Sequence, residues 1–483
     1  MDDVVIISSE GFFISAGPQF VASLLIDHGY QVSVVQALDQ FTFDEITALV
    51  DKFIVNEKQI LGLSLTFTRS LDAKKAMKTF VDLARKKFSN LRIVAGGATN
   101  ELDIRFFFPT NTIYLMGQNK ENEIIDLFNR LTGRIKKLPF NFLDRKIHYR
   151  KIFPNPTIGQ AMFLEVSKGC KFDCPFCSME LRRNKSVFKT KERLKQEMQE
   201  FYDVFGDHKD FINVVLLCNT VNEDEDKIKT LYEACEELTF NPRFFAFTRF
   251  DLYCTQNETT KAFYRKYVRY PYFGVESFNQ LTLRAIFKST KVEKMKSELI
   301  EFRKDCPDAF IYGSFVIGLP HETIESLEET CEWIKSSDIF DFINFPVLTI
   351  NKITPNLVEY SNIDLEPEKF GYTAFDQKDF PFKNPKLTGL PSYWQREDGF
   401  TSEDALVAAN AISARLNSKL SYQVFMVGTA RGEDVPNYKV RRDVIFSKVW
   451  RDEQENAILT RWKDIAGNFS KEYYGNLMNS IPQ

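Results

Sequence analysis

Three cysteines that lie close together in the chain are the residues whose types and spacing point most directly to chemistry. Cys170, Cys174 and Cys177 form the pattern C-x3-C-x2-C, directly after the apolar segment 162–166. Thiolates bind soft metals, and three of them in one short loop suit an iron–sulfur cluster. Three protein ligands for four irons leave one iron open, as catalytic metal sites leave a coordination position open. The pattern therefore predicts a [4Fe–4S] cluster that can bind a further group.

The alternative for these cysteines is a structural zinc site or three thiols that bind no metal. A structural zinc ion takes four ligands, mostly cysteine and histidine, and the next such residue after Cys177 is His208. The chain has 8 cysteines among 483 residues, which is too few for a disulfide framework. An iron–sulfur cluster therefore explains the three cysteines better than zinc or disulfides do.

The elements that must position this loop are apolar strands that alternate with helices. The expected strands are residues 162–166, 214–217, 244–247, 272–275, 310–317 and 342–347. A complete eightfold barrel takes roughly 250 residues, so six strand–helix units in this shorter span predict a partial (β/α)6 barrel. Barrel enzymes keep their active sites at the carboxyl ends of the strands, where the cysteine loop begins.

A separate α/β pattern precedes this barrel. Short, wholly apolar strands such as residues 4–8 and 60–65 alternate with amphipathic helices such as residues 73–88. Such strands are typical of a parallel sheet that helices cover on both faces. The length of 483 residues gives a prior of roughly three domains. We expect an α/β protein with a Rossmann-like domain over 1–135, a linker over 136–160, the barrel over 161–350 and a mostly helical C-terminal extension over 351–483.

The cysteine motif resembles that of the radical S-adenosylmethionine (radical SAM) superfamily, and Phe176 matches the aromatic residue that usually precedes its last cysteine. The resemblance implies that the open iron binds the amino and carboxylate groups of S-adenosylmethionine (SAM). It further implies that one electron from the reduced cluster cleaves SAM to a 5′-deoxyadenosyl radical.

More motifs of the same superfamily follow in the expected order between residues 160 and 350. They are Arg249 with Asp251 after the third strand, Glu276 with Ser277 in the fourth-strand motif, Leu283 and Lys288 beyond it, and Gly318 in the fifth-strand motif. The resemblance implies that Phe176, Arg249, Glu276, Ser277 and Gly318 contact SAM. At Gly318 the missing side chain would let the backbone approach the flat adenine base.

The first domain resembles the cobalamin-binding domain of one large radical SAM subgroup. The matching residues are Gly17, Pro18, Leu24, Gly29, Tyr30, 63–66 and 96–98. The resemblance implies cobalamin contacts from Ser64, Thr66, Gly96, Gly97 and Gly117. Two departures stand out, because residues 117–121 replace the usual Gly-Glu-Gly-Glu, and the segment around His28 lacks the Asp-x-His-x-x-Gly loop. A Rossmann-like domain kept for packing or for docking a substrate is the alternative.

Two further cysteines follow strands of the expected barrel. Cys218 comes directly after the second strand, and Cys254 lies just beyond the third. Either thiol is a candidate catalytic hydrogen-atom donor to a substrate radical, because its S–H bond is weak. The alternative for both is a buried thiol that only packs.

The leading hypothesis is cobalamin-dependent methylation of an unactivated carbon in a peptide or natural product. The rival is a cobalamin-independent radical modification of a peptide, such as epimerisation of an α-carbon, with Cys218 or Cys254 as the hydrogen donor. A third hypothesis is a scaffold or sensor that binds SAM without turnover.

The expected partners follow from composition and from the resemblance. The resemblance implies a peptide or small-molecule substrate and an electron donor such as flavodoxin or ferredoxin. A net charge of -3 argues against nucleic acid, although residues 134–151 form a local basic patch. No apolar run reaches the roughly 18 residues that span a bilayer, so we expect no membrane contact and a cytoplasmic location.

Overall fold

The computed structural model describes two compact units. One comprises residues 1–160, 196–208 and 457–483, and the other comprises residues 161–195 and 209–456. The described residues are 3–9, 16–36, 38–65, 71–97, 108–116, 120–134, 140–152, 162–178, 186–205, 211–353, 360–384 and 390–416.

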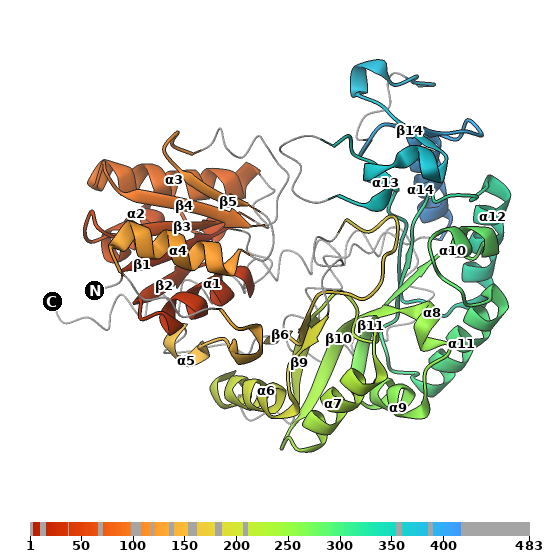
Figure 1. Cartoon of the computed structure of the whole chain (residues 1–483), viewed down its shortest axis with the longest axis horizontal. Coiled ribbons are helices and arrows are strands. Elements are labelled where there is room, and N and C mark those ends of the chain that lie inside the picture. Colours follow the sequence, from red (N-terminus) through yellow and green to blue (C-terminus); the bar gives the residue numbers. More distant parts are fainter. Residues whose placement is uncertain are drawn as a thin grey trace. The chain divides into compact units, whose positions relative to one another are not determined.

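The first unit is built on a parallel sheet with the strand order β2-β1-β3-β4-β5 (Figure 1). Its strands are β1 (Val4–Ser8), β2 (Val32–Val35), β3 (Ile60–Ser64), β4 (Arg92–Gly97) and β5 (Ile113–Met116). Helix α1 packs with α4, and α2 packs with α3. This order is doubly wound, and such sheets bind ligands at the carboxyl edge, where the order reverses between β1 and β3. The helices are α1 (Ala16–Asp27), α2 (Phe43–Phe53), α3 (Leu71–Lys87) and α4 (Glu121–Thr132).

Local sequence explains these elements. All five residues of β1 are buried, and all but Ser8 are apolar, as expected for a central strand. Thr42 begins α2 with a capping box, in which its hydroxyl accepts from the backbone of Glu45 and the Glu45 carboxylate accepts from the backbone of Thr42. The expected linker contains a 3-10 turn, Phe142–Asp144, and a short helix, α5 (Tyr149–Ile152), in this unit.

The second unit contains a six-stranded parallel sheet with the order β13-β12-β11-β10-β9-β6. Its strands are β6 (Met162–Glu165), β9 (Phe211–Leu217), β10 (Asn241–Arg249), β11 (Val268–Glu276), β12 (Tyr312–Phe315) and β13 (Phe342–Asn344). The partial (β/α)6 barrel expected from the sequence is therefore confirmed. Strands β10 and β11 begin earlier than expected, because Pro242 and Pro271 resemble turn residues in the sequence but lie inside the strands.

Helices connect these strands and return the chain to the start of the next one. They are α6 (Lys191–Phe205), α7 (Glu225–Glu236), α8 (Phe250–Tyr253), α9 (Glu258–Tyr267), α10 (Gln280–Ala285), α11 (Val292–Asp305) and α12 (Ile324–Ser337). The many phenylalanines of the chain find their place here, because aromatic rings pack in series between strands and helices. Phe273, for example, lies with its ring centroid 4.7 Å from that of Phe250 and 5.0 Å from that of Phe302.

The described part of the C-terminal extension joins the second unit. It comprises α13 (Asn362–Leu365), two 3-10 turns (Pro367–Phe370 and Gln377–Asp379), the antiparallel pair β14 (Tyr372–Ala374) and β15 (Trp394–Arg396), and α14 (Ser402–Arg415). The β14–β15 pair was not expected from the sequence, because strands of only three residues are too short to show a clear alternating pattern.

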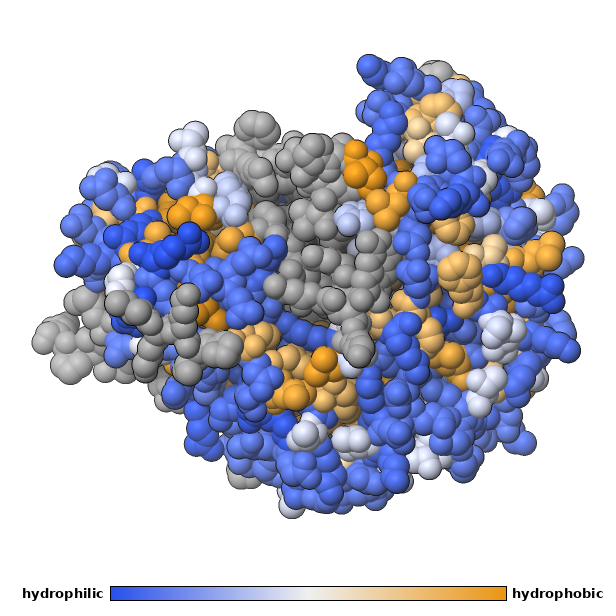
Figure 2. Space-filling view, in the orientation of Figure 1, coloured by the Kyte–Doolittle hydropathy of each residue, from blue (hydrophilic) through white to orange (hydrophobic). Residues whose placement is uncertain are grey.

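The described surface is mostly hydrophilic on the face drawn in Figure 2, with hydrophobic residues in scattered groups. Among the helices that the structure describes, none has the length and apolar character needed to cross a membrane.

Candidate active site

The three cysteines lie in the loop that follows β6. A short strand, β7 (Ser167–Lys168), pairs with β8 (Val187–Phe188), and the left-handed Gly169 (φ 88°) then starts the loop. Cys170, Cys174 and Cys177 are all half-buried, and the backbone N–H of Cys177 donates to the carbonyl of Cys174 at 3.1 Å. The loop thus turns back on itself and gathers three thiols in eight residues.

The chemistry of these thiols fits an iron–sulfur cluster. Burial, together with the charges of Glu223, Cys174 and Cys177, raises the pKa of Cys170 to about 11 against the lowering effect of a backbone hydrogen bond at Phe172. Such mutual repulsion between thiolates is relieved when a cationic cluster binds them. Among the described residues, no three Cys, His, Asp or Glu side chains converge as ligands of a single metal ion. The thiolates of a four-iron cluster bind separate irons, and three cysteines in one loop suit that arrangement.

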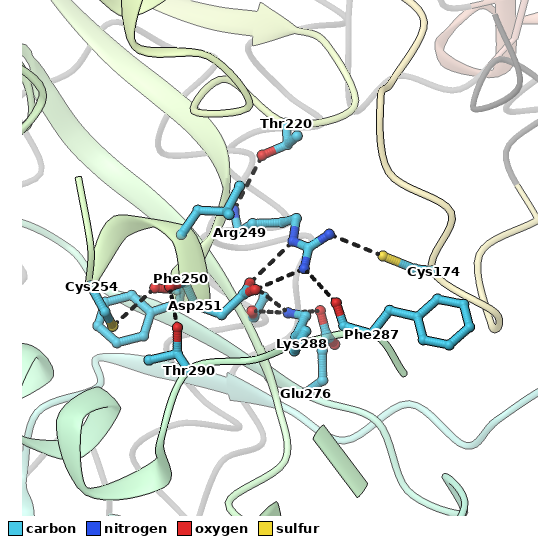
Figure 3. A network of polar contacts seen from close by, with 12 residues as sticks. Cys174, Thr220, Arg249, Phe250, Asp251, Cys254, Glu276, Phe287, Lys288 and Thr290 are labelled. Atoms are coloured by element: carbon cyan, nitrogen blue, oxygen red, sulfur yellow. Dashed lines mark hydrogen bonds and ion pairs between the residues drawn. The ribbon is translucent and has the colours of Figure 1, made fainter. Parts of the chain in front are cut away.

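Arg249 is the charged side chain that connects the cysteine loop to the barrel (Figure 3). Its Nη1 lies 3.5 Å from the Cys174 Sγ, and its guanidinium stands over the ring of Phe172 at 4.1 Å. Asp251 holds the same guanidinium through two hydrogen bonds, of 3.1 Å to Oδ1 and 2.7 Å to Oδ2. Burial raises the pKa of the Cys174 thiol, and the positive charges of Arg249 and Lys288 oppose that rise.

Lys288 brings a second cation to the same place. It is only 1% exposed, and its Nζ lies 2.7 Å from the Gly274 carbonyl, 3.2 Å from Glu276 Oε1 and 3.6 Å from Asp251 Oδ1. Burial alone would raise the pKa of Asp251, but Lys288 and Arg249 outweigh it and keep that pKa below its usual value. The result is a buried, ionised network at the carboxyl ends of β10 and β11.

Glu276 is held at this network by an unusual backbone. Its φ is 69°, in the left-handed region that non-glycine residues rarely adopt. A Cβ atom on Gly274 would lie 2.6 Å from Glu276 Oε1, so glycine is required for the carboxylate to reach Lys288. Non-glycine residues in strained conformations cluster at functional sites. Ser277, the next residue, is 3% exposed, and its Oγ accepts from the backbone of Asn279.

Gly318 lies in the turn after β12 with φ 95°. The indole ring of Trp394 occupies the space beside Gly318, because a Cβ atom on Gly318 would lie 2.6 Å from that ring. The Gly318 N–H donates to Glu322 Oε2 at 2.7 Å. Burial raises the pKa of Glu322 to about 8, against the lowering effect of this bond. A contact between Gly318 and adenine stays a prediction.

The two candidate hydrogen donors occupy different surroundings. Cys218 is half-buried, burial raises its pKa, and the charges of Glu223 and Cys170 raise it further, so the thiol lies near the cysteine loop. Cys254 is 2% exposed and donates to the Phe250 carbonyl at 3.1 Å. In Figure 3 it lies on the other side of the Arg249–Asp251 pair from Cys174. Both catalytic roles stay predictions.

In the first unit, Ser64 and Gly96 are register partners at the carboxyl ends of β3 and β4, and Gly97 follows with φ 134°. These three residues therefore share the edge where doubly wound sheets bind ligands. Thr66 and Gly117 lie outside the described residues.

Sequence reasoning missed several groups that support the site. Thr220 Oγ1 and Asn222 Oδ1 both accept from the backbone N–H of Arg249, at 3.2 and 3.0 Å. Glu223 accepts from the backbone of Lys171 at 3.2 Å. A run of polar residues after β9 was the available signal, because that strand ends at the same edge as the cysteine loop.

Comparison with known proteins supports this assignment of the barrel. Residues 164–334 match the Radical SAM superfamily. An uncharacterized methyltransferase (PH0819) from Pyrococcus horikoshii is 23% identical over 69% of this chain and 75% of its own length. A tRNA-2-methylthio-N(6)-dimethylallyladenosine synthase from Bifidobacterium longum subsp. infantis is 25% identical over 62% of this chain, which spans 64% of that relative.

Solved structures with the same fold cover both units. The radical SAM methyltransferase TsrM from Kitasatospora setae, with cobalamin and a [4Fe–4S] cluster bound, has a TM-score of 0.58 at 12% identity. That match covers 96% of this chain and 100% of TsrM. The cobalamin-dependent radical enzyme OxsB, with aqua-cobalamin and S-adenosylmethionine bound, has a TM-score of 0.54 at 15% identity, over 77% of this chain and 56% of OxsB.

Proposed function

Because residues 164–334 form a radical SAM domain, we propose that this enzyme performs cobalamin-dependent methylation of an unactivated carbon in a peptide or natural product. The observation that carries the proposal concerns the two parallel sheets, because the carboxyl ends of the strands in each sheet carry residues that suit a cofactor. One edge joins the cysteine loop to the Arg249 network, and the other presents Ser64, Gly96 and Gly97 on a doubly wound sheet. The likeness to TsrM, which binds both cofactors, supports this combination.

Each edge offers groups that suit its cofactor. Cys170, Cys174 and Cys177 would hold the cluster, and Ser64, Gly96 and Gly97 would meet the corrin edge or its side chains. When bound, the cluster supplies the electron that cleaves SAM, and cobalamin carries the methyl group. The described donors at the first edge include backbone groups and the hydroxyls of Ser8 and Ser64, which suits a large amide-rich ligand.

The chain's own residues prepare the barrel edge for a charged ligand. Arg249 fixes a positive charge beside the Cys174 thiolate, which stabilises the negative charge of a cluster bound by thiolates. Asp251 orients that guanidinium by a bidentate contact. Glu276 and Lys288 present a carboxylate and an ammonium together, so they can bind hydroxyl, ammonium or carboxylate groups of SAM.

The proposal is tested with enzyme purified anaerobically from cells supplied with cobalamin. We expect a corrinoid spectrum, about four irons per chain for the single cluster, and SAM turnover under reduction by flavodoxin or ferredoxin. Product should gain the mass of one methyl group. Protein that retains iron and turns over SAM but binds no corrinoid would contradict cobalamin-dependent methylation.

The position of Cys218 favours a second candidate function, the cobalamin-independent modification of a peptide. Burial keeps this thiol protonated, and a hydrogen-atom donor must carry its S–H hydrogen. Deuterium uptake from heavy water without a methyl gain would support this function. Under it, Cys218→Ala abolishes product while SAM cleavage continues; under methylation, Cys218→Ala changes neither.

The substrate is also open to test. A relative of the chain is named as a tRNA-modifying synthase, so the absence of nucleic acid among the substrates stays a prediction. Incubation with tRNA and with peptide mixtures, followed by mass spectrometry for added methyl groups, separates these classes.

A further inference from the structure

Three side chains of the C-terminal extension contact the turn after β12. The hydroxyl of Tyr372 donates to the Gly318 carbonyl at 2.6 Å, and Arg396 Nη1 donates to the Leu319 carbonyl at 2.9 Å. The indole of Trp394 fills the space of the absent Gly318 Cβ. We call Tyr372, Trp394 and Arg396 the C-terminal clamp.

The clamp is itself held rigidly. Trp394 is 0% exposed, its Nε1 donates to the Leu348 carbonyl at 2.8 Å, and its ring meets that of Tyr372 edge-on at 5.3 Å. Arg396 is fixed by bonds of 3.1 and 2.5 Å to the carboxylate of Asp398. Few rotamers are open to side chains packed in this way, so the clamp can fix the backbone that it contacts.

Side chains hold three backbone polar groups of the turn, and the backbone N–H of Glu322 also donates to the Leu319 carbonyl at 3.3 Å. The Gly318 N–H donates to Glu322, the Gly318 carbonyl accepts from Tyr372, and the Leu319 carbonyl accepts from Arg396. A buried turn of this kind depends on its partners, because an unmade bond to a buried carbonyl is costly. Two of these three partners lie beyond residue 334, where the superfamily match ends.

The same extension also contacts the cysteine loop. The backbone N–H of Ile363, in α13, donates to the Pro175 carbonyl at 3.0 Å, between Cys174 and Cys177. Ile363 and the clamp residues of the extension therefore contact two loops at the carboxyl end of the barrel sheet. These are the cysteine loop and the Gly318 turn.

We propose that Tyr372, Trp394 and Arg396 are positioning residues for SAM, which hold the Gly318–Leu319 turn in the conformation that receives the adenosyl part of the molecule. This inference rests on the proposed function, because it assumes that SAM binds at the carboxyl edge of the barrel. The clamp acts through the turn and need not touch SAM itself. It makes the C-terminal extension a required part of the SAM site.

The test uses full-length enzyme with its cluster reconstituted, and the variants Tyr372→Phe and Trp394→Phe. Tyr267→Phe is the matched control, because its hydroxyl donates to Glu236 at 2.5 Å at the opposite end of the barrel strands. Two quantities are measured: the Kd for SAM by equilibrium dialysis, and hydrogen exchange at the amides of residues 316–322 without SAM. Iron content and melting temperature report whether each variant keeps its cluster and fold.

We expect Tyr372→Phe to weaken SAM binding by roughly three- to tenfold, the change in Kd that one net hydrogen bond corresponds to. Exchange in the turn should become faster, while the Tyr267→Phe control changes neither quantity. If both clamp variants keep wild-type exchange and Kd, with iron retained, the clamp proposal is overturned although the proposed function stands. Wild-type enzyme that binds no SAM would overturn both.

Discussion

The two parallel sheets of this protein differ in what their strands carry at the carboxyl ends. In the barrel unit, that edge holds three thiols and a buried network of Arg249, Asp251 and Lys288 whose members fix one another. In the first unit, the described edge includes Ser8, Ser64, Gly96 and Gly97, which offer backbone groups and hydroxyls. A small, highly charged ligand group needs fixed countercharges, whereas a large neutral macrocycle needs room and backbone contacts. The difference therefore matches a cluster with SAM at one edge and cobalamin at the other.

The largest effect should come from the cysteine loop. We expect Cys174→Ala to lose the brown absorbance and all SAM turnover, because the proposed function makes the Cys174 thiolate a cluster ligand. Cys331→Ala is the control, since Cys331 lies in α12 and is 0% exposed. Iron content and SAM consumption are the measurements. Wild-type iron content in Cys174→Ala would show that Cys174 does not bind the cluster, and would contradict the difference drawn between the two sheets.

A large loss of stability should follow from Asp251→Asn. This change leaves the buried charges of Arg249 and Lys288 without their shared carboxylate, which should lower the free energy of unfolding by about 3 kcal/mol. Asp376→Asn breaks only a surface pair with Lys352 and should leave stability unchanged. Denaturant unfolding of both variants makes the comparison. If the two variants were equally stable, the buried network of Arg249, Asp251 and Lys288 would not stabilise the fold as we infer.

The buried carboxyl of Glu322 should make the barrel unit sensitive to pH. Its pKa of about 8 in the folded state exceeds the usual value of 4.5, so the folded state holds a proton that the unfolded state has lost between those values. Stability should therefore fall as pH rises from about 5 to 8, on the order of 1 kcal/mol per pH unit. Glu322→Gln should remove that part of the pH dependence. An unchanged pH profile in this variant would show that Glu322 ionises normally.

The smallest effect should come from a substitution at the carboxyl edge of the first sheet. It should lower the corrinoid content without changing the iron content. Gly97→Ala places a side chain on backbone at φ 134°, with a strain of about 1–2 kcal/mol, beside the expected cobalamin contacts. We expect several-fold less corrinoid per chain with unchanged iron. Gly133→Ala also places a side chain at a positive φ (70°), after α4, where a Cβ meets no atom within 4 Å, and should keep its corrinoid. Equal corrinoid content in both variants would show that cobalamin does not bind at this edge.

The sequence was sufficient for much of the fold because continuous apolar strands and helical periodicity are local signals. The cysteine loop was found for the same reason, since its ligands lie within eight residues. The clamp was not found, because Tyr372 and Trp394 lie far along the chain from Gly318 and only the tertiary fold brings them together. The part played by Thr220 and Asn222 in holding Arg249 was missed because polar residues after β9 do not indicate which backbone N–H they bind.

The two edges are expected to bind their cofactors in one enzyme, and one measurement tests this most directly. Wild-type protein from cobalamin-supplied cells is reduced anaerobically with SAM, and its corrinoid spectrum, 5′-deoxyadenosine and S-adenosylhomocysteine are followed together. We expect a bound corrinoid and SAM-derived products in the wild type, and retained corrinoid without either product in Cys174→Ala. Wild-type protein with an intact cluster but neither corrinoid nor SAM-derived product would contradict the claim.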